Sequence, residues 1–102
     1  MATVGTFDLV VRLWQHPSAG GWHFVAVPPE VGAEIADLTG GTRRGFGSVR
    51  VEVTVGATSW RTSVFPDAAS GGYLLPVKQA VRRAERLEAG DELAVRVVLA
   101  DL

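Results

Sequence analysis

The residues in this chain with the clearest chemical potential are basic. Lys78, Arg82 and Arg86 are spaced i, i+4 and i+8, so they share one face of the helix that this segment predicts. Donors on the two preceding strands and the backbone N–H groups at the helix start could converge with them on a phosphate or a carboxylate. The candidate anion site consists of Arg61, Ser63, Tyr73, Lys78 and Arg82.

Two structural explanations compete with this site. The basic helix face could be simply solvated, with Glu85 and Glu88 giving partial compensation. An internal carboxylate such as Asp67 or Glu52 could also pair with the cations, and the cluster would then stabilise the fold rather than bind a solute. The sequence leaves these alternatives open.

Other kinds of site are poorly supported. His16 and His23 stand seven residues apart with no third ligand at a suitable spacing, so we expect no metal. Ser63 lacks the strand-turn-helix elbow of a serine nucleophile, and no histidine is placed to activate it. The glycines of 45–47 and 71–72 match neither a phosphate-binding loop nor a dinucleotide fingerprint. We therefore expect no catalytic residue and no cofactor.

Composition narrows the class of protein. A chain of 102 residues with 47% hydrophobic residues fits one domain, spanning 1–102. A net charge of −1 gives no global field for nucleic acid, so nucleic-acid binding is not expected without a local basic patch. The chain has no cysteine and neither a signal-like start nor a long apolar run, so we expect a cytoplasmic protein without a membrane span.

Apolar and polar side chains alternate in several segments, which is typical of half-buried strands. The alternation is strictest in residues 48–55, where Val49, Val51, Val53 and Val55 share one face. The expected strands are residues 6–13, 22–27, 48–55, 59–65, 73–75 and 93–99. We expect residues 6–13 and 22–27 to form one hairpin, and 48–55 and 59–65 a second across the Gly56-Ala57 turn.

Two short helices are expected, each after a proline that ends a strand. Residues 30–38 carry an apolar stripe of Val31, Ile35 and Leu38. For residues 77–87 the residues expected to be buried are Val77, Ala80, Val81, Ala84 and Leu87.

Residues 22–55 and 73–99 each follow the order strand, proline, helix, glycine turn, valine-rich strand. Neither unit can close its own apolar face, so two of them facing each other would bury a common core. We therefore predict a mainly β fold, a small closed or nearly closed β-barrel of six to seven strands with two short helices. The strands expected to share this core contribute Phe7, Leu9, Val11, Leu13, Val49, Val51, Val53, Val95, Val97 and Leu99.

Several segments resemble a known family. They are residues 44–51, 60–66, 73–78, 81–84 and 87–91, with the elements Leu-Pro-Val-Lys, Val-Arg and Gly-Asp in order. Together they resemble the small bacterial domain of unknown function known as DUF1905. The resemblance implies a double-split β-barrel, similar in shape to the AbrB-type regulators.

The AbrB likeness also bears on assembly. AbrB-type subunits make one barrel from two chains, whereas here the two similar units would let one chain supply both halves. We therefore expect a monomer, which lacks the two-fold axis that palindromic operators require. The preferred function is a small binding module for an anionic small molecule or an acidic partner surface. The alternative is an AbrB-like nucleic-acid-binding regulator, and an enzyme of unknown type ranks third.

Overall fold

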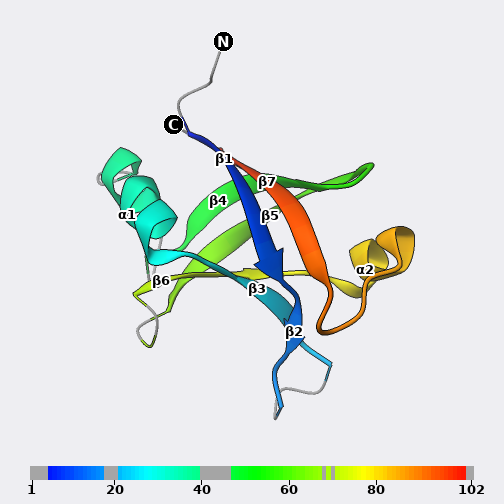
Figure 1. The fold of residues 1–102 in the computed structure, drawn as a ribbon. Coiled ribbons are helices and arrows are strands. Elements are labelled where there is room, and N and C mark those ends of the chain that lie inside the picture. The colour runs from blue at the N-terminus through cyan, green and yellow to red at the C-terminus, as the bar shows by residue number, and fades with distance from the viewer. Residues whose placement is uncertain (1–4, 18–20, 40–46, 68, 70, 101–102) are drawn as a thin grey trace.

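The computed structural model describes residues 5–17, 21–39, 47–67, 69 and 71–100. Within these residues the chain forms seven strands and two short helices (Figure 1). In chain order they are β1 Thr6–Arg12, β2 Trp14–Gln15, β3 His23–Val27, α1 Pro29–Leu38, β4 Val49–Val55, β5 Thr58–Asp67, β6 Gly72–Pro76, α2 Gln79–Glu85 and β7 Glu92–Leu99.

The strands form a nearly closed antiparallel barrel. Their order is β1-β7-β4-β5-β6-β3-β2, so the two outermost strands are consecutive in the chain and meet at Leu13. This bend is held against the turn before β7, because Leu13 N–H donates to the Asp91 carbonyl (2.8 Å) and Gly90 N–H donates to the Leu13 carbonyl (2.7 Å). The prediction of a mainly β barrel with two short helices is therefore confirmed.

A long strand turns the corner on the other side of the barrel. The first part of β5 pairs with β4 as far as Val64, and its last part pairs with β6 from Phe65 onward. The β1–β2 segment does the same with β7 and then β3. Each of these segments therefore belongs to two sheets, which is how a short chain closes a barrel.

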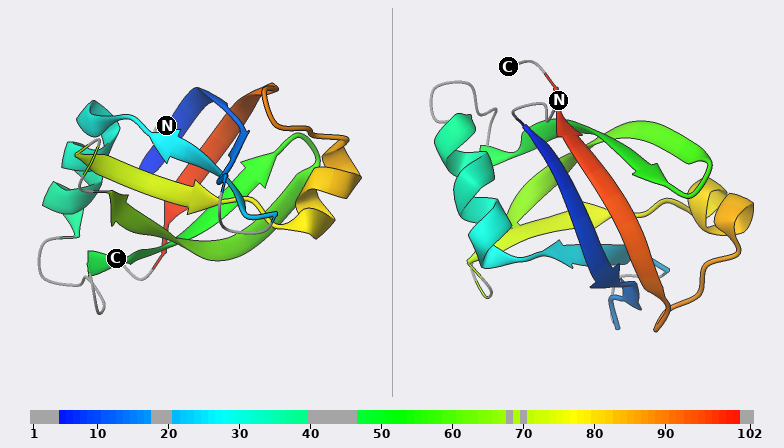
Figure 2. Two further views of the ribbon diagram at one scale, coloured as in Figure 1. Left: turned by 90° about the horizontal axis from the view of Figure 1, so that it is seen from below. Right: turned by 45° about the horizontal axis from the view of Figure 1, so that its top comes forward.

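The two similar sequence units occupy equivalent positions. In the first unit β3 leads through α1 to β4, and in the second β6 leads through α2 to β7. Strands β3 and β6 pair with each other, as do β4 and β7. The helices consequently lie on opposite sides of the barrel (Figure 2).

Nearly all buried side chains belong to one core. Every alternate residue of β4 and of β7 is buried, and the partly buried Phe7 and Val11 pack against the same cluster. The predicted shared core is confirmed for all ten of its residues, because Leu9 and Leu13 are fully buried members. Strict alternation fixes the register here, since a slip of one residue would turn every valine outward.

The first predicted hairpin is only partly formed. Strand β1 pairs with β7 along its whole length, and only Trp14 and Gln15 pair with β3. Residues 45 and 46 of the glycine-containing segment 45–47 lie outside the described residues. Neither α1 nor α2, the helices of the described residues, is long and apolar enough to cross a membrane.

Both helices bury a narrower face than predicted. In α2, Val81 is buried while Ala80 and Ala84 are exposed, because this short helix touches the barrel along one line only. In α1 the buried line runs through Gly32 and Ile35, which turns Leu38 outward at its flank.

Helix α2 also ends earlier than predicted. Arg86 adopts a left-handed conformation (φ 55°), and Leu87 N–H donates back to the Arg82 carbonyl at 2.8 Å. This hydrogen bond closes the helix in a Schellman motif, two residues before the predicted end. Leu87 then packs against the core from beyond the helix, as its partial burial shows.

Candidate functional site

The connection between β6 and α2 is fixed to the neighbouring strand. Val77 is buried, and its N–H donates to the His23 carbonyl of β3 at 2.9 Å. The Val77 carbonyl accepts a hydrogen bond from Arg82 Nε at 3.2 Å. This hydrogen bond holds the guanidinium of Arg82 at the β6–α2 connection, at the end of the barrel where β3 begins.

These cations border a groove of about 420 Å³ between β3, β5 and α2. We call it the α2 groove. Its lining is Gly21, Trp22, His23, Trp60, Arg61, Thr62, Pro76, Val77, Lys78, Gln79 and Arg82. Of the five predicted site residues, the structure brings Arg61, Lys78 and Arg82 together here. The described lining contains no acidic residue, so its charge is positive.

The predicted internal carboxylates do not neutralise the groove. Glu52 lies 3.7 Å from Arg61, but both side chains are largely exposed (51% and 81%), so this ion pair is weak. Asp67 is occupied elsewhere, because its Oδ1 accepts a hydrogen bond from Ala69 N–H. Across the described part of the chain, neither Lys78 nor Arg82 has an ion pair.

Ser63 and Tyr73 lie outside the α2 groove. Ser63 is further along β5 and lines a separate hollow that also contains Arg61. Tyr73 is buried at the start of β6, where its ring packs on Gly32 of α1. Strand β6 runs from α1 toward α2 (Figure 1). Tyr73 lies at the start of this strand, whereas Lys78 follows its far end, just before α2.

Arg86 does not line the α2 groove. It was predicted on one helix face with Lys78 and Arg82, but its left-handed backbone turns it out of the helix, and it lines a neighbouring hollow with Arg82 and Arg83. With seven residues, α2 is also too short for its N-terminus to be a strong anion site. The groove therefore depends on side chains rather than on the backbone donors at the helix start.

Sequence reasoning missed the aromatic part of the groove. Trp22, His23 and Trp60 line it beside the cations. His23 Nδ1 is hydrogen-bonded to the Gly21 carbonyl at 2.6 Å, which orients the ring. The signal available in the sequence was the presence of three tryptophans in a chain of 102 residues.

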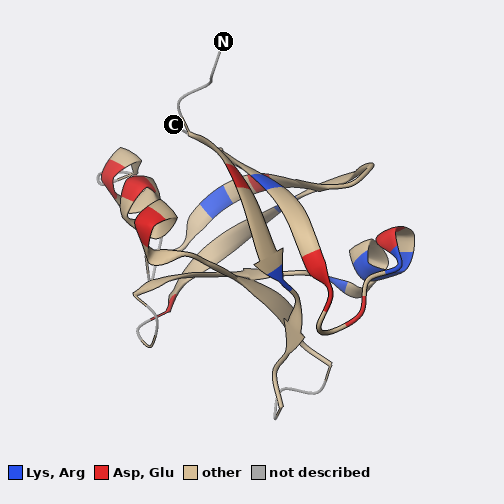
Figure 3. Cartoon of the chain, viewed as in Figure 1, with Lys and Arg blue, Asp and Glu red and all other residues tan. Residues whose placement is uncertain are grey.

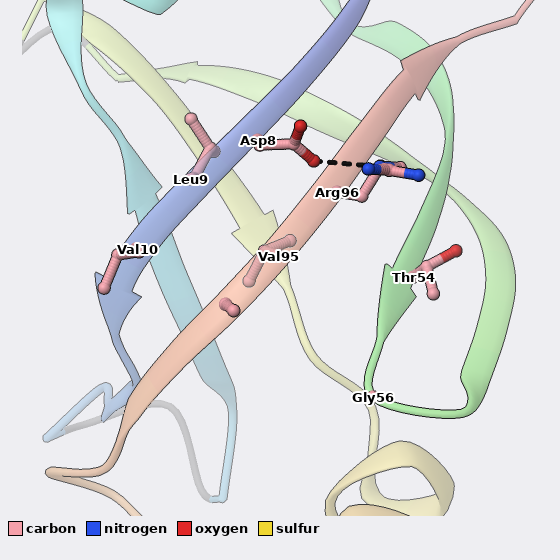
Figure 4. Close-up of a pocket in the computed structure, with 8 residues that line it drawn as sticks. Asp8, Leu9, Val10, Thr54, Gly56, Val95 and Arg96 are labelled. Atoms are coloured by element: carbon pink, nitrogen blue, oxygen red, sulfur yellow. Dashed lines mark hydrogen bonds and ion pairs between the residues drawn. The ribbon is translucent and has the colours of Figure 1, made fainter.

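A second hollow lies on the outer face of β1, β7 and β4, and its charges are already paired. Figure 4 shows Asp8 and Arg96 turned toward each other, with Arg96 Nε donating to Asp8 Oδ1 at 2.8 Å. This hydrogen bond and the attraction of the Asp8 charge raise the pKa of Arg96. Asp8 and Arg96 are paired with each other, so the described lining of this hollow has no unpaired charged side chain that could bind a ligand.

The described residues contain no group of histidine, aspartate or glutamate side chains that could hold a metal ion. A family model for a domain of unknown function, DUF1905, matches residues 10–97. The chain belongs to the DUF1905 family. The DUF1905 match extends from β1 into β7 and so includes all the described residues that line the α2 groove. No curated protein matches the sequence.

Proposed function

We propose that this DUF1905 domain is a binding module for a small anionic molecule, which it holds in the α2 groove. The observation that carries the proposal is the convergence of Arg61, Lys78 and Arg82 on a lining without an acidic residue. Like charges that share a groove repel one another, and an anion that forms charge-assisted hydrogen bonds to them relieves this repulsion. The volume of about 420 Å³ is within the usual range of small-molecule sites.

Isothermal titration with citrate in low salt tests the proposal. Lys78→Gln and Arg82→Gln each remove one cation from the groove, and each should weaken citrate binding by roughly ten- to a hundredfold. Arg83→Gln is the matched control, because Arg83 is exposed on the same helix and does not line the groove. The control should bind citrate like the unmodified chain.

Stability separates a binding role from a structural one. Lys78→Gln should leave the melting temperature unchanged, since the Lys78 side chain has no partner among the described residues. Arg82→Gln removes the hydrogen bond to the Val77 carbonyl and should cost about 1 kcal/mol. Absence of citrate binding by the unmodified chain, or an equal loss in Arg83→Gln, would contradict the proposal.

Nucleic-acid binding is the second candidate, and the observation that favours it is the exposed basic surface of α2. Arg83 and Arg86 extend this surface beyond the groove and have no ion pair in the described residues. A nucleic-acid interface should lose affinity for random duplex DNA in Arg83→Gln and Arg82→Gln alike, and its affinity should fall steeply with salt. A site for a small anion should show neither effect.

We also propose a monomeric, AbrB-like double-split barrel. The support is that two equivalent units, β3-α1-β4 and β6-α2-β7, pair with each other within one chain. Sedimentation at micromolar concentration should report a monomer. A dimer whose dissociation coincides with unfolding would indicate intertwined halves instead.

A further inference from the structure

The β2–β3 hairpin carries a cluster of three aromatic rings. The Phe24 ring centroid lies 3.8 Å from that of Trp14 and 4.5 Å from that of Trp22, and the two indoles are tilted against the Phe24 ring by 56° and 34°. Phe24 is 1% exposed, whereas Trp14 and Trp22 remain 42% and 37% exposed. The buried ring therefore holds two partly exposed indoles in place.

One of these indoles belongs to the α2 groove. Trp22 lines the groove with His23 and with Trp60, which is buried on β5. The cations Lys78 and Arg82 enter the same groove from the start of α2. The lining of the groove is therefore both aromatic and cationic.

This combination selects among ligands. Aromatic pockets attract cations through the electron-rich faces of the rings, but Lys78 and Arg82 would repel a cationic ligand here. A small inorganic anion would contact the cations and leave the indole of Trp22 exposed to water. A ligand that has both a flat ring and an acidic group contacts both sides.

We propose that the ligand of the α2 groove is a small aromatic anion, whose ring stacks on Trp22 and whose carboxylate or phosphate binds Lys78 and Arg82. This inference rests on the proposed anion-binding function and adds the chemical class of the ligand. The contact with Phe24 restricts the Trp22 ring before the ligand binds, which lowers the entropic cost of binding.

Matched pairs of probes test the ring separately from the charge. Benzoate and cyclohexanecarboxylate have the same charge and ring size, but only benzoate is flat and aromatic. AMP and ribose 5-phosphate form the corresponding pair for a phosphate ligand. In low-salt titrations of the chain, the aromatic member of at least one pair should bind about tenfold more tightly than its partner.

Variants of the aromatic cluster test which residue causes the preference for the aromatic probe. Trp22→Leu keeps an apolar side chain without a flat ring, and it should abolish the preference for the aromatic probe while citrate affinity stays within about twofold. Trp14→Leu is the control, because Trp14 belongs to the same aromatic cluster and does not line the groove. It should keep the preference, and circular dichroism should show both variants folded.

The outcomes separate the two proposals. If citrate binds but the members of both pairs bind equally, the aromatic inference is wrong and the anion site stands. If Trp14→Leu loses the preference as fully as Trp22→Leu, the Trp22 face is not the ring site. If neither citrate nor any other probe binds, the anion-binding function itself fails.

Discussion

The two helices occupy equivalent places in the two halves of the barrel, yet they differ in charge. Figure 3 shows acidic residues along α1 and mainly basic residues on α2, on opposite sides of the molecule. The acidic residues of α1 are Glu30, Glu34 and Asp37. The basic residues on and beside α2 are Lys78, Arg82, Arg83 and Arg86.

The helices also dock differently. Helix α1 lies so close to β6 that a methyl group added at Gly32 would lie 3.2 Å from the Gly72 Cα. Helix α2 is attached by the buried Val81 and by a hydrogen bond of 2.6 Å from Thr58 Oγ1 to Glu85 Oε2. The two glycines let α1 pack directly on β6, whereas residues of α2 line one edge of the α2 groove. The two helices therefore differ in what they leave open, since α1 packs directly on β6 while the α2 groove remains beside α2.

Substitution of the glycines at close contacts should have the largest effects on stability. In Gly72→Ala the new methyl group would collide with the Val27 carbonyl, which belongs to the rigid backbone, and we expect a loss of about 3 kcal/mol in the free energy of unfolding. In Gly56→Ala the methyl group meets the flexible Glu85 carboxylate at a residue with φ of 58°, and we expect about 1 to 2 kcal/mol. Urea denaturation measures both losses.

The neighbouring Gly71 supplies the control. Its φ is +78° and none of the described residues comes within 4 Å of an added methyl group, so Gly71→Ala tests backbone strain alone and should cost about 1 kcal/mol. If Gly72→Ala costs no more than Gly71→Ala, the approach of the Val27 carbonyl of β3 to Gly72 of β6 is not a tight contact.

The central strands of the two halves should respond equally to truncation. Val51 of β4 and Val97 of β7 are both buried in the common core, so Val51→Ala and Val97→Ala should each lower the free energy of unfolding by about 2 kcal/mol. Val10→Ala, at a residue that is 70% exposed, should change it by less than about 0.5 kcal/mol. A large cost for only one of the two core valines would show that the halves do not share one core.

The helix ends should give the smallest effects, with opposite signs. Arg86 ends α2 in a left-handed conformation that favours glycine, so Arg86→Gly should raise stability by about 1 kcal/mol. Thr39 ends α1, and its Oγ1 donates to the Ile35 carbonyl at 2.6 Å. Thr39→Ala should lower stability by about 1 kcal/mol. Thermal melts compare the two, and an Arg86→Gly chain that melts earlier would exclude backbone strain at this helix end.

Much of the fold could be predicted from the sequence because each barrel strand has one solvent-exposed face and one buried face. That difference produces the valine alternation of β4 and β7, which also identifies the shared core. The helices were predictable in position from Pro28 and Pro76. Their ends and exact faces were not, because Arg86 gives no sequence signal for a left-handed residue.

The candidate site divides in the same way. The alternation and the proximity of Lys78 to Arg82 could be predicted from the sequence, because both depend on residues a few positions apart in the chain. That Trp22 and Trp60 line the groove with these cations, and that Tyr73 packs on α1 instead, follows from the tertiary structure. Those positions depend on which strands pair across the barrel and on the direction of β6. The spacing of residues within one segment does not show which distant segments pair with it.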